Sequence, residues 1–325
     1  MANAILGIDI AKDSFQATLL VGDKKYRRSF RNRPKELTDL TKWLSKHQVT
    51  QVHACMEATG TYWEAVAEYL HDGGHVVSVI NPARIRDYAR SKLARNKTDK
   101  LDADMIADFC QTQDPPPWTP LAPEVRELRD LVRHLEDLRN IRTQESNRLA
   151  SGVASEQVRD MLQSHLAFLD EQIKDLEKRL QDHIDHHPDL KQQRDLLVSI
   201  PGIAALTAAK LLSENIQSFS STRSLVAHAG LNPQSHESGT SVRGRPRLSK
   251  IGNSNMRKAL YFPAISAMRY NPVVRDFCER LAQRNKHKMV IIGAAMRKLL
   301  CLALGVLKSK QPFDPAHALA QTAPI

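Results

Sequence analysis

The sequence has few cysteines, and their positions narrow the class of protein. Only four occur in 325 residues, and no two are closely spaced (Cys55, Cys110, Cys278 and Cys301). This spacing excludes a disulfide framework and a zinc finger as first interpretations, and it fits a reducing cytoplasm. The N-terminal segment is no signal peptide, because its short apolar run soon meets charged residues. We therefore expect a cytoplasmic protein.

Long apolar runs are also scarce. The most apolar segment, residues 289–307, is interrupted by Arg297 and Lys298, so the sequence predicts no membrane-spanning helix. Hydrophobic residues still make up 42% of the chain. The chain is therefore long enough and apolar enough for two or three domains with buried cores.

Acidic residues are rare in one region, which makes the charge distribution uneven. The whole chain has a formal net charge of +11. Residues 241–310 alone contain sixteen lysines and arginines but only two acids, Asp276 and Glu279, which leaves +14 in this block. Such a concentration of charge predicts a polyanionic partner, and nucleic acid is the expected one.

The first 112 residues have the pattern of an α/β domain. Four largely apolar runs predict strands at residues 4–10, 15–21, 52–57 and 75–80, and a tight turn at Gly22-Asp23 predicts a further strand at residues 25–30. Helices are expected at residues 34–46, at residues 62–71 and after the fifth strand. Three strands followed by alternating helices and strands indicate a mixed sheet. Their order matches a ribonuclease-H-like fold.

Residues 96–109 contain four aspartates, which helical periodicity divides into two pairs. At about 100° per residue, Asp102 falls within the apolar stripe of this segment and Asp99 at its edge. Asp104 and Asp108 fall on the opposite side, as solvated acids would. A carboxylate on a buried stripe is costly unless it is paired or binds a metal ion. The pattern therefore favours Asp99 and Asp102 as a functional pair.

Two further acids occupy strand positions. Asp9 interrupts an apolar strand, and Glu57 ends the fourth strand, where an acid would by itself fit a turn or a cap. In a ribonuclease-H-like sheet these two acids converge with Asp99 and Asp102 at one edge. Clustered carboxylates repel one another unless divalent cations lie between them, and hard oxygen ligands suit Mg²⁺ or Mn²⁺. Two such ions can hold both oxygens of a phosphoryl displacement.

A proline-rich linker, residues 113–123, separates this α/β domain from helical sequence. In residues 124–190, apolar side chains recur at three- and four-residue steps, and their second half has the heptad seam of a coiled coil. The sequence leaves open whether these helices pair within one chain or between chains. Residues 191–311 are expected to form a mostly helical domain, followed by a tail at residues 312–325.

A polar segment rich in glycine and arginine lies at residues 236–247. A serine held among its arginines could attack a phosphodiester once activated, although the segment taken alone fits a flexible surface loop better. The basic side chains expected to contact nucleic acid are Arg243, Arg245, Arg247, Lys250, Arg257, Lys258, Arg297 and Lys298.

Seven short motifs follow one another along nearly the whole chain. They are Gly7–Lys12, Met56–Gly60, Asn96–Asp99 with Asp102, Ala229–Leu231 with Pro233, Glu237–Gly239, Met256–Leu260 and Met296–Leu299. Each motif alone is weak. In this order they resemble the motifs of the DEDD transposases in the one-hundred-and-ten family of bacterial insertion sequences.

The resemblance implies a RuvC-like N-terminal domain whose acids Asp9, Glu57, Asp99 and Asp102 bind Mg²⁺. It implies Ser238 as the nucleophile that forms a covalent 5′-phosphoserine link to DNA, because the family's Ser-Gly register selects this serine. It further implies guidance by a structured bridge RNA whose loops pair with donor and target DNA. A tetramer at the bacterial nucleoid, in which the serine of one subunit completes the acids of another, is also implied.

Two alternatives remain open on the residues alone. A junction-resolving nuclease would use the four acids and metal-activated water, and it would need no serine. A non-catalytic scaffold that binds nucleic acid would need neither the acids nor the serine. An aspartate at position 102, on an apolar stripe, argues against the scaffold.

Overall fold

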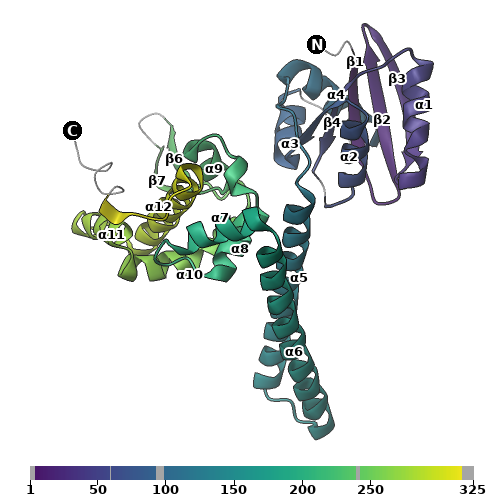
Figure 1. Cartoon of the computed structure of the whole chain (residues 1–325). Coiled ribbons are helices and arrows are strands. Elements are labelled where there is room, and N and C mark those ends of the chain that lie inside the picture. The colour runs from purple at the N-terminus through teal and green to yellow at the C-terminus, as the bar shows by residue number, and fades with distance from the viewer. Residues whose placement is uncertain (1–3, 59, 93–98, 239–241, 317–325) are drawn as a thin grey trace. The chain divides into compact units, whose positions relative to one another are not determined.

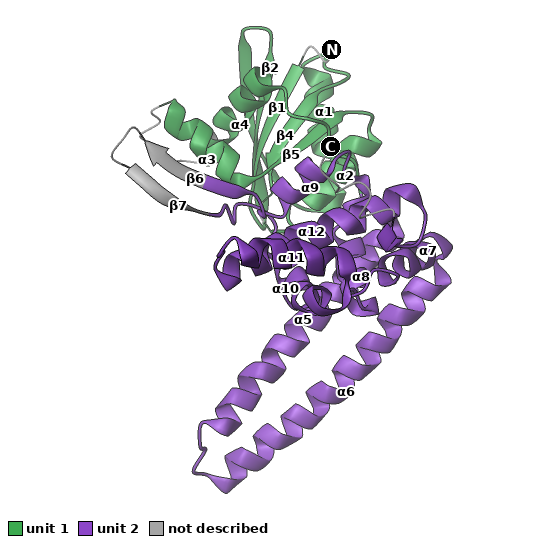
Figure 2. Ribbon diagram, turned by 90° about the vertical axis from the view of Figure 1, so that its left-hand side faces the viewer, with its two compact units in different colours: residues 1–120 green, residues 121–325 purple. Residues whose placement is uncertain are grey.

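The chain divides into two compact units, residues 1–120 and 121–325 (Figure 2). The computed structural model describes residues 4–58, 60–92, 99–238 and 242–316, with the backbone alone at 99–101, 235–238 and 242–246. The boundary between the two units falls within the proline-rich segment.

Unit 1 contains a five-stranded mixed sheet in the order β3-β2-β1-β4-β5 (Figure 1). The strands are β1 (Ala4–Ile10), β2 (Ser14–Val21), β3 (Lys24–Arg31), β4 (His53–Glu57) and β5 (Val76–Ile80). Strand β2 pairs antiparallel with both β1 and β3, whereas β4 and β5 run parallel to β1. This order and these directions are those of the RuvC-like fold, so the predicted fold class is confirmed. Each predicted strand end lies within one residue of the observed one.

Helices cover both faces of this sheet. They are η1 (Pro34–Glu36), α1 (Thr38–Lys46), α2 (Glu64–Asp72), α3 (Pro82–Ser91) and α4 (Asp99–Gln113). On one face, α1 and α2 bury Trp43 and Leu70 against Ile8 of β1. On the other face, α3 and α4 pack around Cys55 of β4, with Ile106 in the same cluster. The central strands are buried on both sides, which explains their nearly continuous apolar sequence.

Unit 2 is almost entirely helical. Its elements are α5 (Pro123–Ala150), α6 (Glu156–His186), α7 (Pro188–Val198), α8 (Ala205–Ser213), η2 (Ile216–Ser218), α9 (Thr222–His228), β6 (Pro233–Ser238), β7 (Val242–Leu248), α10 (Ser254–Tyr270), α11 (Pro272–Gln283) and α12 (Lys288–Ser309). Helices α5 and α6 pair within the chain as an antiparallel hairpin, with Arg142 Nε 2.5 Å from Asp170 Oδ1. The heptad leucines Leu169, Leu176 and Leu180 are buried.

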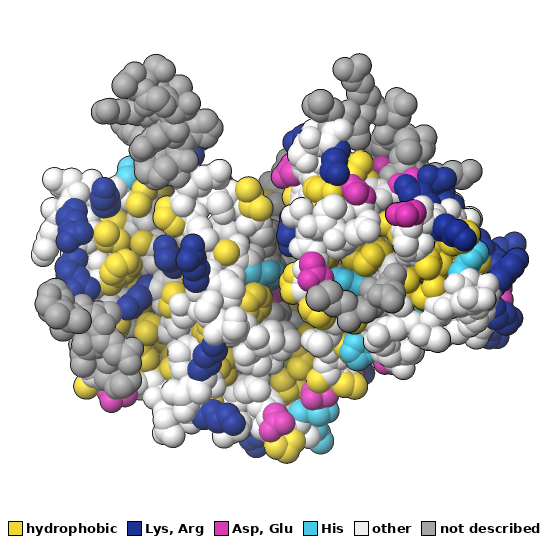
Figure 3. Space-filling view, turned by 90° about the horizontal axis from the view of Figure 1, so that it is seen from above, with side chains coloured by type: hydrophobic (Ala, Val, Ile, Leu, Met, Phe, Trp, Pro, Cys, Tyr) yellow, Lys and Arg dark blue, Asp and Glu magenta, His cyan; other side chains and the backbone are white. Residues whose placement is uncertain are grey.

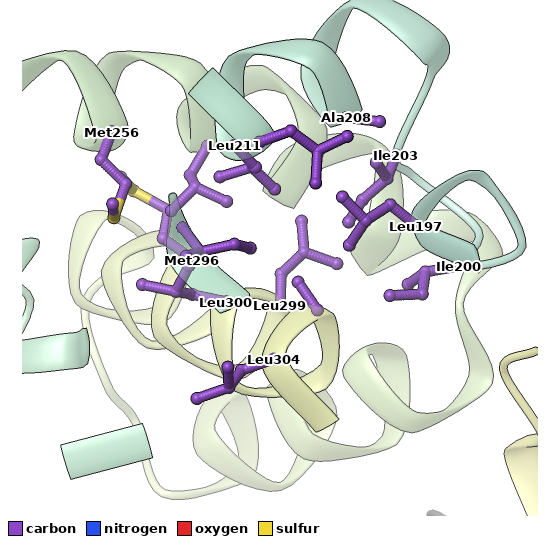
Figure 4. Close-up of a cluster of buried hydrophobic side chains, with 14 of the residues drawn as sticks. Leu197, Ile200, Ile203, Ala208, Leu211, Met256, Met296, Leu299, Leu300 and Leu304 are labelled. Atoms are coloured by element: carbon purple, nitrogen blue, oxygen red, sulfur yellow. The ribbon is translucent and has the colours of Figure 1, made fainter. Parts of the chain in front are cut away.

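The core of unit 2 gathers around helix α12 (Figure 4). Leu299, Leu300 and Leu304 of this helix are fully buried and share one cluster with Leu197 of α7 and Leu211 of α8. By length and composition α12 could cross a membrane, which corrects the expectation that no helix would qualify. Since 61% of its apolar window is buried inside the unit, the apolar side chains are those of a core helix.

The glycine- and arginine-rich segment forms a hairpin, not the irregular loop that fitted the sequence. Strands β6 and β7 pair antiparallel from Pro233 opposite Leu248 to Ser238 opposite Val242, with an irregularity between Gln234 and His236. The pairing satisfies backbone donors and acceptors that a loop would leave to water. The polar side chains conceal this pairing in the sequence, because strands are recognised there by apolar alternation.

Candidate active site

Asp9 and Glu57 occupy neighbouring positions at one edge of the sheet. Strands β1 and β4 are parallel, and their last paired residues are Ile8 and Met56. Asp9 and Glu57 are the next residue on each strand, so they lie on backbones about 4.8 Å apart. Both side chains are partly exposed, and each takes part in an interaction within the chain. The structure thus brings the two strand acids together.

Helix α4 crosses the face of the sheet on which Asp9 lies. A Cβ atom at Gly7 would lie 2.4 Å from the backbone oxygen of Ala103 and 2.7 Å from the Cβ of Ala107. Only glycine permits so close an approach of helix and strand. Gly7 and Asp9 are two residues apart on one strand, so they face the same side. Asp102, the residue before Ala103, therefore belongs to the part of α4 that covers this face.

The other end of α4 fixes the direction of the helix. The Sγ atom of Cys110 donates to the backbone oxygen of His53 at 3.7 Å, and His53 begins β4. Helix α4 therefore runs opposite to β1 and β4. Its first turn, which carries Asp99 and Asp102, points toward the edge where Asp9 and Glu57 lie. Asp102 is partly exposed and interacts within the chain, whereas the side chain of Asp99 lies outside the described part.

The oxygen atoms of these acids are of the type that binds a divalent cation. Carboxylate oxygens are the hard ligands that Mg²⁺ and Mn²⁺ prefer, and Asp9, Glu57 and Asp102 approach one edge from three elements. Among the side chains that the structure describes, no three acids, histidines or cysteines gather closely enough to hold a metal ion. Asp99, in the first turn of α4, is not in that set. The donor chemistry of these acids therefore suits the ion, whereas the three described side chains are not themselves gathered into a metal site.

Asp104 is not a solvated acid, contrary to the expectation from periodicity. Its carboxylate accepts hydrogen bonds from Thr18 Oγ1 at 2.8 Å and from Arg27 Nε at 2.9 Å, and Lys25 Nζ lies 3.3 Å away. Burial would raise the pKa of Asp104, but the hydrogen bonds from Arg27 and Thr18 and the charge of Lys25 outweigh it and lower the pKa to about 2. Asp104 therefore ties α4 to β2 and β3.

Asp108 also has partners that the sequence did not indicate. Its Oδ2 accepts a hydrogen bond from Tyr88 Oη at 2.8 Å, and Lys92 Nζ lies 3.2 Å from the same oxygen. These contacts join α3 to α4. Periodicity assigned Asp104 and Asp108 to the face away from the apolar stripe, but it carries no information about which neighbours reach round to that face.

Ser238 lies at the end of strand β6, opposite Val242. Its side chain, like those of Arg243 and Arg245, lies outside the described part of the structure. The serine belongs to unit 2, whereas the four candidate acids belong to unit 1.

The remaining basic residues on unit 2 have different surroundings. Arg257 has a structural task, because its Nη1 donates to the backbone oxygens of Ala229 at 3.0 Å and Gly252 at 3.2 Å. Four of the other predicted contacts have exposed side chains, namely Arg247, Lys250, Lys258 and Arg297. Lys298 is half-buried. Lysine and arginine side chains are scattered over the face of unit 2 seen in Figure 3, with few acids among them.

Comparison with known proteins gives two family matches. A model described as "Transposase" matches residues 6–155, and the model "Transposase IS116/IS110/IS902 family" matches residues 194–279. The chain is 33% identical over 320 residues to the pilin gene-inverting protein of Moraxella bovis, covering 97% of this chain and 98% of that protein. It is 24% identical over 288 residues to the transposase for insertion sequence element IS1328 of Yersinia enterocolitica, covering 79% and 81%.

Among solved structures, the chain resembles T. thermophilus RuvC in complex with a Holliday junction substrate. The TM-score is 0.27 and the sequence identity 14%, and the match covers 35% of this chain and 99% of that one.

The two family matches define a transposase, an enzyme that recombines DNA. The chain belongs to the IS116/IS110/IS902 family of insertion-sequence transposases, as its seven motifs predicted. These matches do not favour the alternative of a junction-resolving nuclease.

Proposed function

We propose that this transposase cleaves and rejoins DNA strands through a covalent 5′-phosphoserine intermediate on Ser238, at a composite site with Asp9, Glu57, Asp99 and Asp102. The observation that carries the proposal is the edge at which Asp9 adjoins Glu57 and toward which the first turn of α4 points. Such a constellation of acids serves phosphoryl transfer and has no evident use in a binding scaffold.

The four acids would hold Mg²⁺ or Mn²⁺, which when bound neutralises charge on the scissile phosphate and orients it. The acids themselves fix where that phosphate can bind, because their positions are set by two strand ends and one helix. The tight contact of α4 with Gly7 keeps the third element from moving relative to the first. This contact would hold the backbone that carries the acids in place before DNA binds.

Ser238 carries out the covalent step. Its Oγ attacks the phosphorus, a P–Oγ bond forms, and the bond from phosphorus to the 3′ oxygen breaks. The proton lost from the serine balances the proton that the leaving 3′ oxygen gains. The phosphoserine bond conserves the energy of the phosphodiester, so the 3′ hydroxyl of another strand can later displace the serine without an external energy source.

The acids and the serine come from different units, which suits a site completed between subunits. We infer a tetramer in which the serine of one subunit meets the acids of another. Residues 241–310 would hold the DNA and RNA backbones through their excess positive charge. Choice of donor and target would rest on base pairing with a bridge RNA, as in other guided systems.

The test follows the covalent link between protein and DNA. Full-length protein is incubated with Mg²⁺, labelled element-end DNA and the RNA transcribed beside the gene, and adducts are resolved on a denaturing gel. Ser238→Ala should abolish both cleavage and adduct, while Ser235→Ala and Ser241→Ala, its matched neighbours, keep both. Cleavage that persists in Ser238→Ala would instead indicate metal-activated water. An adduct that forms equally without the RNA would contradict the proposal that a bridge RNA guides the choice of DNA.

A further inference from the structure

A polar hollow of about 410 Å³ opens in unit 2 beside the start of β6. It lies between helix α9, the residues that lead into β6 and helix α12. The residues that line it include Thr222, Arg223, Asn232, Pro233, Arg297 and Cys301. Its volume falls within the range of sites that bind small ligands or parts of larger ones. The lining contains no acidic residue.

Two arginines from different helices share this hollow without a counter-charge. Arg223 comes from α9 and Arg297 from α12, and both are exposed. Within the described ranges neither guanidinium has an ion pair or a hydrogen bond. Some other arginines of unit 2 are paired with an acid; Arg280 Nη2, for example, lies 3.2 Å from Asp276 Oδ2. Two unpaired guanidinium groups in one hollow favour an anion between them, and their fork geometry suits phosphate.

The other lining groups favour the backbone of a nucleic acid over a simple inorganic anion as the ligand of this hollow. The hydroxyl of Thr222 and the amide of Asn232 can donate hydrogen bonds to phosphate oxygens. Pro233 and Cys301 offer apolar surface against which a sugar or base could pack. Side-chain hydroxyls, amides and arginines are the usual phosphate contacts of DNA-binding proteins.

The hollow also has a fixed relation to Ser238 along strand β6. Pro233 lines the hollow and begins β6, and Ser238 ends it. Five residues of extended chain span at most about 17 Å, which equals about five nucleotide steps of duplex DNA. An irregularity between Gln234 and His236 shortens this span. A phosphate in the hollow would therefore lie within about five nucleotides of the serine.

We propose that this hollow, the Arg223–Arg297 pocket, binds a backbone phosphate of the DNA strand that Ser238 attacks, and so keeps that strand in register with the serine. The register rests on the proposed function, because the serine defines the point of attack. The binding of DNA phosphate by the pocket does not depend on cleavage, so the two can be tested apart.

Cys301 provides a reporter inside the pocket. It is partly accessible, whereas Cys55, Cys110 and Cys278 are buried. Full-length Ser238→Ala protein is alkylated with N-ethylmaleimide, with and without a mixed-sequence DNA duplex, and modification of each cysteine is followed by peptide mass spectrometry. DNA should slow alkylation of Cys301 several-fold, and Arg223→Gln should remove most of this protection. The matched control is Arg280→Gln, which removes a charge already paired with Asp276.

Salt dependence gives an independent readout. Loss of one phosphate contact lowers the slope of log affinity against log salt by about 1. Arg223→Gln and Arg297→Gln should each show this change, and Arg280→Gln should not. Cys301 alkylation that ignores bound DNA would overturn the proposal, as would equal effects of Arg280→Gln and Arg223→Gln. Protection by RNA alone, without DNA, would also overturn it. Intact protection with no covalent adduct in the wild-type protein would instead contradict the role of Ser238.

Discussion

Arg27 and Asp104 form a two-point ion pair between edge strand β3 and helix α4. Arg27 Nε donates to Asp104 Oδ1 at 2.9 Å, and Nη2 donates to Oδ2 at 2.6 Å. Asp104 lies two residues after Asp102, so the pair fixes the rotation of the helix that carries a candidate catalytic acid. The side chain of Asp104 is only 14% exposed, whereas that of Arg27 is 50% exposed, so the pair is shielded at its carboxylate end.

Removing this pair should loosen α4. We expect Asp104→Asn to lower the free energy of unfolding by about 2 kcal/mol, because the charged hydrogen bonds from Arg27 and Thr18 are weakened. Asp39→Asn is the control, since Asp39 pairs with Lys42 on an exposed helical turn and such pairs contribute about 0.5 kcal/mol or less. Chemical denaturation measures both, and an equal effect of the two substitutions would contradict the assignment.

The same carboxylate predicts a pH dependence. The pKa of Asp104 is lowered to about 2 in the folded protein from an ordinary value of 3.8. A depressed pKa means that the unfolded chain binds the proton more readily, so the contribution of Asp104 is complete above about pH 5 and is lost as the pH falls toward about 2. The stability difference between wild type and Asp104→Asn should shrink across this window. A stability difference that stays constant down to pH 2 would rule out protonation of Asp104 as the cause of the pH dependence.

Gly7 sets the distance between α4 and β1. A Cβ at this position would lie 2.4 Å from the backbone oxygen of Ala103 and from the backbone nitrogen of Ala107. Gly7→Ala should therefore push the helix away, cost about 1–3 kcal/mol of stability and reduce DNA cleavage, because Asp102 moves with the helix. Gly305→Ala is the control, as nothing lies within 4 Å of its added Cβ. Unfolding and cleavage assays on both variants check this, and wild-type cleavage by Gly7→Ala would contradict it.

Removal of divalent metal should separate chemistry from binding. Chelation is expected to stop cleavage while DNA binding persists, because the acids and the basic block belong to different units. Asp102→Asn should reduce cleavage by about 10²–10³-fold in the presence of Mg²⁺, whereas Asp39→Asn should leave it unchanged. Cleavage rates and binding isotherms measured on the same preparations show whether the metal ion is needed for cleavage alone or also for DNA binding. The scaffold alternative would gain support if no condition gave a cleaved product.

Local patterns in the sequence predicted unit 1 well, because four of its five strands are short, largely apolar runs bounded by turns, and the polar strand β3 follows a tight turn. The proximity of Asp9 and Glu57 followed from strand order alone. The partners of Asp104 did not, since Lys25, Arg27 and Thr18 are remote in sequence and periodicity describes only the helix itself.

Unit 2 shows three other limits of sequence patterns. The β6–β7 hairpin is stabilised by backbone pairing between polar strands, so no apolar alternation marks it. Helix α12 is long and apolar enough to cross a membrane, contrary to the prediction from its two internal basic residues, because burial inside a helical core selects the same side chains. The Arg223–Arg297 pocket joins residues 74 positions apart, which no local motif could connect.

The residue that carries DNA after cleavage identifies the nucleophile of this transposase. Wild-type protein that has reacted with element-end DNA is digested with nuclease and protease, and the modified peptide is sequenced by mass spectrometry. The expected product is a nucleotide joined through its 5′ phosphate to Ser238. Cleaved DNA with a free 5′ phosphate and no modified peptide would contradict it.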